Sequence, residues 1–394
     1  MLDSIYIGMS GLTAYSRGLQ VIANNAANLN TPGFKRATLQ FADQFYSKDS
    51  GEVGSLGGNA GQVGHGLATH GTHLNFLQGE LRRTGNDLDL AVDGAGLFVL
   101  KGEDGTLRFT RAAQFEFNKE GVLVNRTDSA KVMARGQDGS FSSVSINGLK
   151  TNAASASKTV TITGNLPSTQ TQTSVSVKVL DSAGGEHALT MNLTADTTAG
   201  ANRWTAALLD GTSSVGTTTL AFANGRPTAE TAKMSFTYKP TGVPEMPMTF
   251  DFSTDVTSFA ANDLSTLVAK QDGLPVGALT KVAFDDSGVL NASYSNGQNV
   301  KGVGLALARF DSLDAVESSG ENTFVANDLR SWTFGGASSG GFGKVRSGSI
   351  EASNVDLSRE FSDLVIMQRG YQASSQIVST ANEMIQQLFS MKNK

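Results

Sequence analysis

The chain has 394 residues, a formal net charge of −5 and no cysteine. This length suits two or three domains with a sizeable core, and the absence of cysteine excludes disulfides, thiolate nucleophiles and cysteine-ligated zinc. No basic cluster indicates binding to nucleic acid or to an anionic membrane surface. No stretch approaches the roughly 18 consecutive apolar residues of a transmembrane helix, so we expect no membrane insertion.

The first predicted element is an amphipathic helix over residues 2–29. Apolar or small residues recur at alternating spacings of three and four, which places them on one face of a helix. The large members of this N-terminal stripe are Leu2, Ile5, Met9, Leu12 and Leu19. Because the stripe is about four heptads long and no helical domain adjoins it, we expect it to pack against the other end of the chain or against another copy.

An asparagine-rich break follows this helix. Its residues are Asn24, Asn25, Asn28, Thr31, Pro32, Gly33 and Phe34. Proline and glycine together end a helix, and the asparagine side chains are expected to bond to backbone groups there. We predict a linker or connecting segment over residues 30–70.

The interior of the chain has a β pattern. From about Leu88, apolar residues alternate with polar ones between turns rich in Gly and Asn, which indicates antiparallel hairpins. We predict one split β domain from residues 71–146 and 281–356. Residues 147–280 hold several short strands in a Thr-rich setting and predict an inserted outer β domain, either a barrel or a sandwich.

A second amphipathic helix is predicted over residues 357–394. The large members of its stripe are Leu364, Met367, Tyr371, Val378, Ile385 and Leu388. The residues before it, Ser353, Asn354, Val355 and Asp356, resemble a capping box. The predicted fold is therefore α+β and mostly β, with residues 1–29 and 357–394 forming a coiled-coil-like terminal helical domain.

The sequence contains no pattern typical of an active site, a cofactor site or a metal site. Residues 336–340 match the spacing of a nucleophile elbow, but they lie among glycines and no histidine is near. His65, His70 and His73 are close in sequence, yet they lie in a Gly-rich segment without a cysteine or a rigid scaffold. We expect no catalytic residues, cofactor or metal. A cell-wall enzyme would need a carboxylate pair in a cleft.

Several segments, in this order, resemble the rod-and-hook family of bacterial flagellar axial proteins. They are residues 24–35, 88–98, 109–111 with 115 and 121–124, 348–357, 360–361 and 368–373. The last segment adds Gln368 and Arg369 to the residues that resemble family motifs. The length of the chain and its large β insert resemble the hook proteins of this family more than the shorter rod proteins.

The resemblance implies a structural subunit, not an enzyme, that polymerises with itself into a flexible, curved helical tube. Such a hook acts as a universal joint that transmits torque from rod to filament. The implied partners are the flagellar rod, the hook cap, the hook-filament junction proteins and the type III export apparatus, and the implied location is the extracellular hook of the flagellum. A distal-rod protein of the basal body shares the terminal motifs and is an alternative. A secreted β-rich surface protein would explain the insert but not the paired helices.

Overall fold

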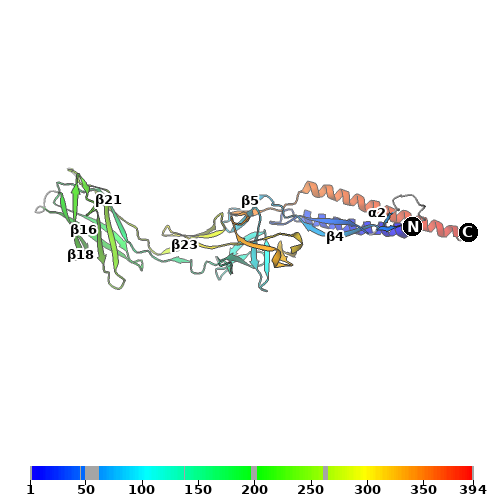
Figure 1. Cartoon of the computed structure of the whole chain (residues 1–394), viewed down its shortest axis with the longest axis horizontal. Helices are drawn as coiled ribbons and strands as arrows, with labels where there is room; N and C mark the ends of the chain where they lie inside the picture. The colour runs from blue at the N-terminus through cyan, green and yellow to red at the C-terminus, as the bar shows by residue number, and fades with distance from the viewer. Residues whose placement is uncertain are drawn as a thin grey trace. The chain divides into compact units, whose positions relative to one another are not determined.

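A computed structural model describes residues 2–44, 46–48, 62–136, 138–196, 202–260 and 265–392. Among these residues, one long α-helix lies near each end of the sequence, and the residues between the two helices are mostly in β-strands (Figure 1). The chain divides into two compact units. Unit 1 is Met1–Asn147, Val282–Asn291 and Lys301–Lys394, and unit 2 is Gly148–Lys281 and Ala292–Val300.

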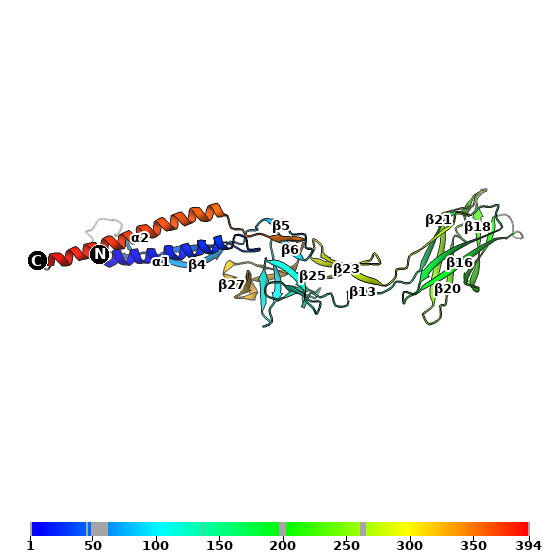
Figure 2. The same cartoon turned by 180° about the vertical axis from the view of Figure 1, so that it is seen from behind.

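The two helices of unit 1 pack against each other. α1 spans Leu2–Ala27 and α2 spans Leu357–Lys392, close to the ranges predicted from the two stripes. Gly8 lies against Val378 and Gly18 lies against Met367, so the two helices are antiparallel. Figure 2 shows them side by side.

A β-hairpin-like pair lies along α1. β1 (Ala37–Asp43) pairs antiparallel with β4 (Leu67–Leu74), and both strands contact α1. A shorter pair consists of β2 (Tyr46–Lys48) and β3 (Gln62–Gly64). Residues 30–70, for which we predicted only a connecting segment, therefore contain strands.

The remaining strands of unit 1 form mainly one 12-stranded sheet. Its strands are β6 (Asp89–Asp93), β7 (Leu97–Lys101), β8 (Leu107–Thr110), β9 (Ala113–Phe117), β10 (Leu123–Asn125), β11 (Lys131–Arg135), β12 (Phe141–Ser143), β26 (Ala306–Phe310), β27 (Val316–Gly320), β28 (Thr323–Ala326), β29 (Trp332–Gly336) and β30 (Lys344–Ser347). Strands from distant parts of the sequence pair here, as β7 does with β26 and β6 with β30. The rings of Phe109 and Trp332 stack in its core with centroids 4.0 Å apart.

Two further sheets have two and four strands. β5 (Leu81–Arg83) pairs with β31 (Ser349–Glu351), just before α2. Another sheet has the order β13 (Thr151–Asn152), β23 (Gly277–Phe284), β24 (Val289–Tyr294) and β25 (Asn299–Gly304). Two short 3-10 helices, Leu313–Ala315 and Leu329–Ser331, precede β27 and β29.

Most of unit 2 consists of two sheets around one core. One sheet has the order β15 (Gln172–Leu180), β16 (Glu186–Ala195), β17 (Arg203–Asp210), β18 (Ser213–Ala223) and β19 (Arg226–Pro227). The other has the order β20 (Lys233–Tyr238), β21 (Met246–Thr257), β14 (Thr159–Asn165) and β22 (Val268–Gln271). Buried side chains of both sheets, including Leu189, Trp204 and Phe250, belong to a single hydrophobic cluster. Alternate residues of each strand supply this cluster, as expected for sheets with one buried face.

Candidate assembly site on the terminal helices

The contact between α1 and α2 depends on small residues. A Cβ added at Gly8, Gly11 or Gly18 would lie between 2.6 and 2.9 Å from a side chain of α2, closer than real Cβ atoms approach. The α2 side chains at these points are Val378, Ser374 and Met367, respectively. This glycine contact therefore holds the two helix backbones closer together than larger side chains would permit.

The predicted apolar stripes lie beside this contact. Met9, Tyr371 and Leu388 are 55%, 42% and 49% exposed. The other members that can be described, Ile5, Leu12, Leu19, Leu364, Met367, Val378 and Ile385, are half-buried. The side chain of Leu2 lies outside the described residues.

On α1, the glycine contact has the same spacing as the predicted stripe but lies one residue earlier, about 100° around the helix. It passes through Gly8, Gly11, Tyr15, Gly18 and Ile22. The centre of the intrachain contact is therefore not the predicted stripe on α1, whose members flank it. On α2, Met367 and Val378 belong to both the predicted stripe and the contact.

Asn25, at the end of α1, connects that helix to β1 and to α2. Its side chain is buried, and Nδ2 donates to the carbonyl of Ala37 at 2.8 Å and to Glu360 Oε2 at 3.0 Å. Its Oδ1 accepts from the N–H of Ala37 at 3.0 Å. Asn28 Nδ2 donates to the carbonyl of Asn24 at 2.9 Å. The predicted hydrogen bonds from asparagines to the backbone at the helix end are thus confirmed for Asn25 and Asn28.

The Pro-Gly break fixes the chain against the large sheet. Gly33 has φ of +70°, and an added Cβ would lie 2.4 Å from the backbone nitrogen of Ala112, so both the conformation and the space require glycine. Thr31 Oγ1 donates to Asn28 Oδ1 at 3.0 Å. The carbonyl of Pro32 accepts from Asn322 Nδ2 at 3.1 Å.

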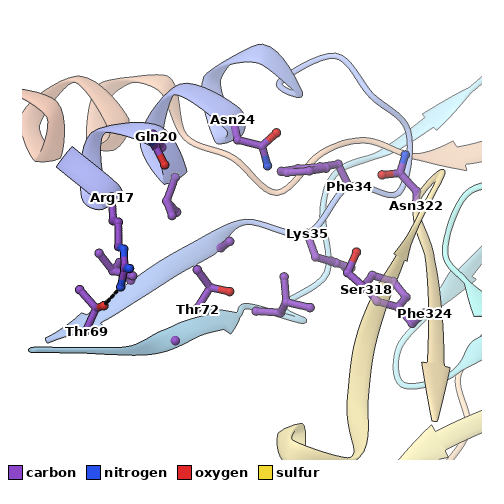
Figure 3. A pocket seen from close by; sticks show the side chains of 15 residues that line it. Arg17, Gln20, Asn24, Phe34, Lys35, Thr69, Thr72, Ser318, Asn322 and Phe324 are labelled. Atoms are coloured by element: carbon purple, nitrogen blue, oxygen red, sulfur yellow. Dashed lines mark hydrogen bonds between the residues drawn. The ribbon is translucent and has the colours of Figure 1, made fainter. Parts of the chain in front are cut away.

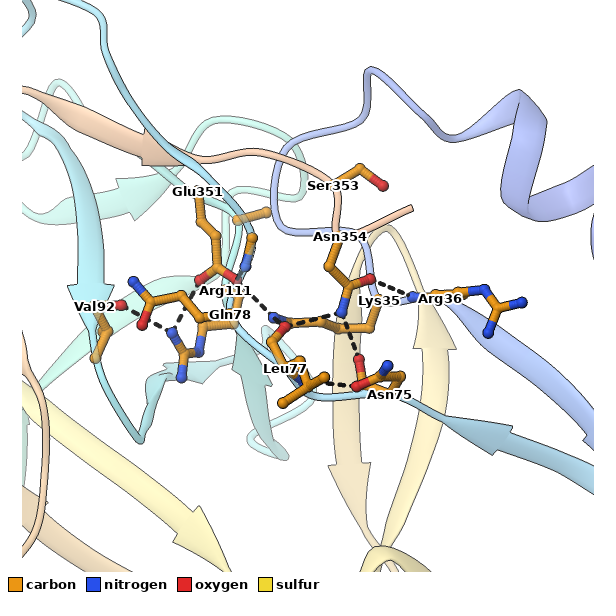
Figure 4. Close-up of polar contacts among 12 residues, drawn as sticks. Lys35, Arg36, Asn75, Leu77, Gln78, Val92, Arg111, Glu351, Ser353 and Asn354 are labelled. Carbon is orange, nitrogen blue, oxygen red and sulfur yellow. Dashed lines mark hydrogen bonds and ion pairs between the residues drawn. The ribbon is translucent and has the colours of Figure 1, made fainter. Parts of the chain in front are cut away.

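Next to the break, three buried charged side chains from distant parts of the sequence meet. Figure 4 shows Lys35 and Arg111 converging on Glu351. Lys35 Nζ lies 2.6 Å from Glu351 Oε1, and Arg111 Nη1 lies 2.9 Å from Glu351 Oε2, with all three side chains at most 6% exposed. Burial lowers the pKa of the Lys35 amine and of the Arg111 guanidinium, and the Glu351 carboxylate opposes both shifts. Since a buried charge without a partner is costly, Glu351 is the centre of this cluster.

A second cluster connects the start of α2 to the same segment. Arg36 pairs through Nε with Glu360 and through Nη2 with Asp363 at 2.7 Å. Asn354 Oδ1 accepts from the N–H of Arg36 at 2.7 Å, and its Nδ2 donates to the carbonyl of Leu77 at 2.8 Å. We call the two clusters together the ionic junction. Its charged members are three cations, Lys35, Arg36 and Arg111, and three carboxylates, Glu351, Glu360 and Asp363.

The start of α2 differs from the predicted capping box. Asp356 is the N-cap residue, because its Oδ1 accepts from the N–H of Ser358 at 2.9 Å and of Arg359 at 3.4 Å. A capping box would need Glu or Gln at the position of Arg359, so the reciprocal bond is missing. Ser353 Oγ instead accepts from the N–H of Val355 at 3.4 Å, before the helix begins.

The other selected motif residues lie outside the ionic junction. Gln368 and Arg369 are exposed on α2, where Arg369 Nη1 lies 3.4 Å from Gln372 Oε1. None of the charged residues of the junction was selected as a site residue from the sequence, although Lys35, Arg111, Glu351 and Glu360 lie in segments that resemble the family. Two sequence features could have pointed to them. Two adjacent cations, Lys35 and Arg36, follow the break, and two carboxylates, Glu351 and Glu360, lie on either side of the predicted start of the second helix.

A cleft of about 620 Å³ lies on the side of α1 that faces away from α2. Figure 3 shows Arg17, Gln20 and Asn24 of α1 on one wall of the cleft, with the β1–β4 pair below and the β27–β28 pair beside it. Phe34 also lines it. Arg17 Nη1 donates to Thr69 Oγ1 at 2.6 Å.

Within the described ranges, no group of three or more His, Cys, Asp or Glu side chains is placed to bind a metal ion. His70 and His73, which we expected in a loop, lie on β4. In the described part of the chain, no helix is long and apolar enough to cross a membrane.

Three family models match the chain. Residues 5–35 match "Flagella basal body rod protein", and residues 346–391 match "Flagellar basal body rod FlgEFG protein C-terminal". Residues 91–177 match "Flagellar hook protein FlgE/F/G D1 domain". The two terminal matches contain most of α1, its break and most of α2, so they coincide with the candidate site.

Curated relatives match over nearly the whole chain. The flagellar hook protein FlgE of Rhizobium meliloti is 31% identical over 414 residues, with 98% of each chain covered. The FlgE proteins of Borreliella burgdorferi and Salmonella typhimurium are each 28% identical, covering 100% and 98% of this chain and the same shares of their own. The crystal structure of Helicobacter pylori flagellar hook protein FlgE2 covers 69% of this chain at 13% identity with a TM-score of 0.46, too low to add to the fold description.

Proposed function

Because the chain belongs to the flagellar hook protein family and is a structural subunit of the flagellar hook, we propose that its copies polymerise through α1 and α2 into a flexible, curved tube. The family is structural and not enzymatic, and its members lie in the flagellum. The tube would join the rod to the filament as a universal joint.

One observation supports this proposal above the others: the helix pair leaves many large apolar side chains in water. On α2 they include Phe361, Val365, Ile366, Ile377, Met384, Leu388, Phe389 and Met391, and on α1 Tyr6 and Met9, each 44% to 74% exposed. Scattered exposed apolar residues are normal, but a run along one helix pair is typical of an interaction surface. Each such side chain contributes about 1.5–3 kcal/mol when it is fully buried. Neighbouring copies would cover them.

The residues of the predicted stripes take two roles in this proposal. Met9, Tyr371 and Leu388 contact neighbouring copies, because they are exposed in the single chain. Ile5, Leu12, Leu19, Leu364 and Ile385 support the helix pair from its flanks, and Met367 and Val378 lie in its contact. The pair then forms a coiled-coil-like inner layer of the tube from residues 1–29 and 357–394.

The domain division is part of the same proposal. Residues 30–70 connect the helices to a split β domain of residues 71–146 and 281–356, and residues 147–280 form an inserted outer domain. The two sheets of unit 2 share one core, which favours a sandwich or barrel for that insert. The outer domains would make mostly polar contacts, which exchange more easily than apolar ones. Bending would therefore be soft, while the closely packed inner helices would resist twist.

The specific partners also belong to the proposal. A tube in this position would meet the rod at one end and the hook-filament junction proteins at the other. During growth it would meet the hook cap, and each subunit would reach it through the type III export apparatus. No nucleic acid, membrane insertion or cofactor has a part in this function.

The test compares two adjacent residues of α2. Ile377 is 47% exposed and apolar, and Gln376 is exposed and polar. We expect the unmodified chain at high concentration to form curved tubes in negative-stain electron microscopy, and Ile377→Asp to raise the concentration needed for assembly at least tenfold. Gln376→Asp adds the same charge one residue away and should assemble as the unmodified chain does. Equal assembly of the two variants, or no tubes from the unmodified chain, would contradict the proposal.

A further inference from the structure

The cleft beside α1 has apolar walls that the single chain does not cover. Val21, Phe34, Leu39 and Leu74 line it and are only half-buried. Phe324 also lines the cleft and belongs to the core of the large sheet. At about 620 Å³ the cleft is within the range of sites that hold apolar groups of ligand size.

An apolar pair projects from the start of α2. Phe361 and Val365 are 56% and 53% exposed and lie one helical turn apart, so their side chains form one raised patch. This part of α2 is fixed by the Asp356 cap and by the pairing of Arg36 with Glu360. A rigid apolar patch loses little entropy when it is bound.

The patch and the cleft lie on opposite faces of the helix pair. Gly370 faces Tyr15 of α1. Phe361 lies nine residues before Gly370, which is about two and a half helical turns, so its side chain points away from α1. On α1, Gly18 faces α2, and Gln20 of the cleft is about 200° away. The patch therefore points away from the cleft of its own chain.

The patch and the cleft also lie at the same level along the pair. Glu360 bonds to Asn25, and Met367 lies against Gly18, so Phe361 and Val365 are level with the part of α1 between these contacts. Gln20 and Asn24, which line the cleft, belong to that part. A second copy placed beside the first would bring its patch to the cleft. The two contact surfaces differ, so the contact repeats head to tail and generates a ring or a helix instead of a closed dimer.

Charge favours the same arrangement. Arg359 is exposed in the first turn of α2, and Glu321 is exposed in the turn between β27 and β28, next to Asn322 of the cleft. Neither has an ion-pair partner within the described part of the chain. Asn322 bonds to the carbonyl of Pro32, which places Glu321 at the end of the cleft where α2 begins.

We propose that Phe361 and Val365 of one copy occupy the cleft beside α1 of the next copy, with Arg359 next to Glu321. This inference rests on the proposed function, because it names one contact through which the subunits polymerise. The chain contains no cysteine, so introduced cysteines report on this contact alone.

The main experiment uses full-length chains with single cysteines. Gln20→Cys and Val365→Cys chains are mixed in equal amounts, assembled and gently oxidised. We expect a disulfide-linked dimer from the mixture and none from either variant alone, since a disulfide needs Cα atoms within about 7 Å. A mixture of Gln20→Cys with Gln376→Cys is the control, because residue 376 lies about 16 Å further along α2 and is also exposed.

The outcomes separate this contact from the proposed function. Tubes without a link between residues 20 and 365, or equal linking of the control pair, overturn the contact and leave polymerisation intact. That result would assign the cleft to another flagellar protein or to no partner. If the unmodified chain forms no tubes, the proposed function fails and this contact fails with it.

A charge exchange tests the second half of the contact. Arg359→Glu should raise the concentration needed for assembly about tenfold, and Arg359→Glu combined with Glu321→Arg should restore it. A carboxylate in the first turn of a helix favours the helix, so Arg359→Glu should leave the monomer folded, as far-ultraviolet circular dichroism can check. If the double variant assembles as poorly as the single one, or the single one assembles normally, the pairing of Arg359 with Glu321 is wrong.

Discussion

The terminal helix pair and unit 2 use their large apolar side chains in opposite ways. In unit 2, Leu189, Trp204 and Phe250 lie between two sheets and are at most 2% exposed. On α2, Ile366 and Phe389 are 61% and 64% exposed. Unit 2 buries most of its large apolar side chains in its own core, whereas the helix pair leaves many of them exposed.

The difference follows from what fills each contact. When a core of Trp, Phe and Leu forms, it removes apolar surface from water. This burial stabilises the folded state by about 25 cal/mol for each Å². The glycine contact between α1 and α2 removes little side-chain surface, because glycine has no side chain. The helix pair thus leaves its apolar side chains exposed, where the proposed contact with other copies would cover them. Loss of a helix should affect assembly and leave unit 2 unchanged, and four predictions test that separation.

The largest effect is expected from deletion of residues 357–394. The deletion removes most of the exposed apolar side chains of the pair and should abolish tubes, while unit 2 keeps its melting temperature. Trp204 in unit 2 and Trp332 in unit 1 are the two tryptophans of the chain, so a Trp332→Phe background reports on unit 2 alone. Tubes from the truncated chain would show that the helices are not the assembly surface.

The next largest effect is expected at the ionic junction. Glu351→Gln leaves Lys35 and Arg111 buried without a carboxylate, and breaking such a pair costs about 3–5 kcal/mol. Urea unfolding followed by tryptophan fluorescence should detect this loss in unit 1 in a Trp204→Phe background. The same measurement in a Trp332→Phe background should show no change for unit 2. The control is Glu103→Gln, which removes the same charge from an exposed position. A loss below about 1 kcal/mol would mean that the junction contributes little to unit 1.

A pH effect is expected in unit 2. Burial and the hydrogen bond to Asp210 raise the pKa of Tyr238 to about 12, above the value of about 10 in an unfolded chain. The folded state therefore holds this proton more tightly, so its contribution is complete below pH 10 and is lost as the pH rises to 12. The free energy of unfolding of unit 2 should fall by about 2–3 kcal/mol over that interval. Tyr238→Phe should remove this part of the slope, and an unchanged slope would assign it to other groups.

Local sequence patterns predicted the two terminal helices, because the spacing of apolar residues along a helix can be seen within the segment itself. The helix range 2–29 differs from α1 by two residues at its end, and the range 357–394 begins at the same residue as α2. The β1–β4 pair was missed because its strands are far apart in sequence. In addition, His70, Gly71 and Thr72 of β4 show no apolar alternation.

The ionic junction was not predicted because burial of a charge depends on distant partners. Asn25 and Glu360 are separated by 335 residues, and Arg111 and Glu351 by 240. Taken alone, each charged residue indicates a solvated surface position. Only the fold brings the opposite charges together.

The glycine contact was missed for a related reason, and it supplies the smallest predicted effect. Glycine weakens an isolated helix by about 1 kcal/mol relative to alanine, so Gly11→Ala would stabilise α1 if space were available. A Cβ at Gly11 would lie 2.6 Å from Ser374 Oγ, so we expect a net loss of about 1–2 kcal/mol instead. Thr13→Ala, on the exposed face of the same helix, should stabilise slightly or change nothing. Thermal unfolding followed at 222 nm measures both variants. If Gly11→Ala stabilised the helices as Thr13→Ala does, α1 and α2 would not be held at glycine distance, and the apolar side chains of the pair could pack against each other within one chain.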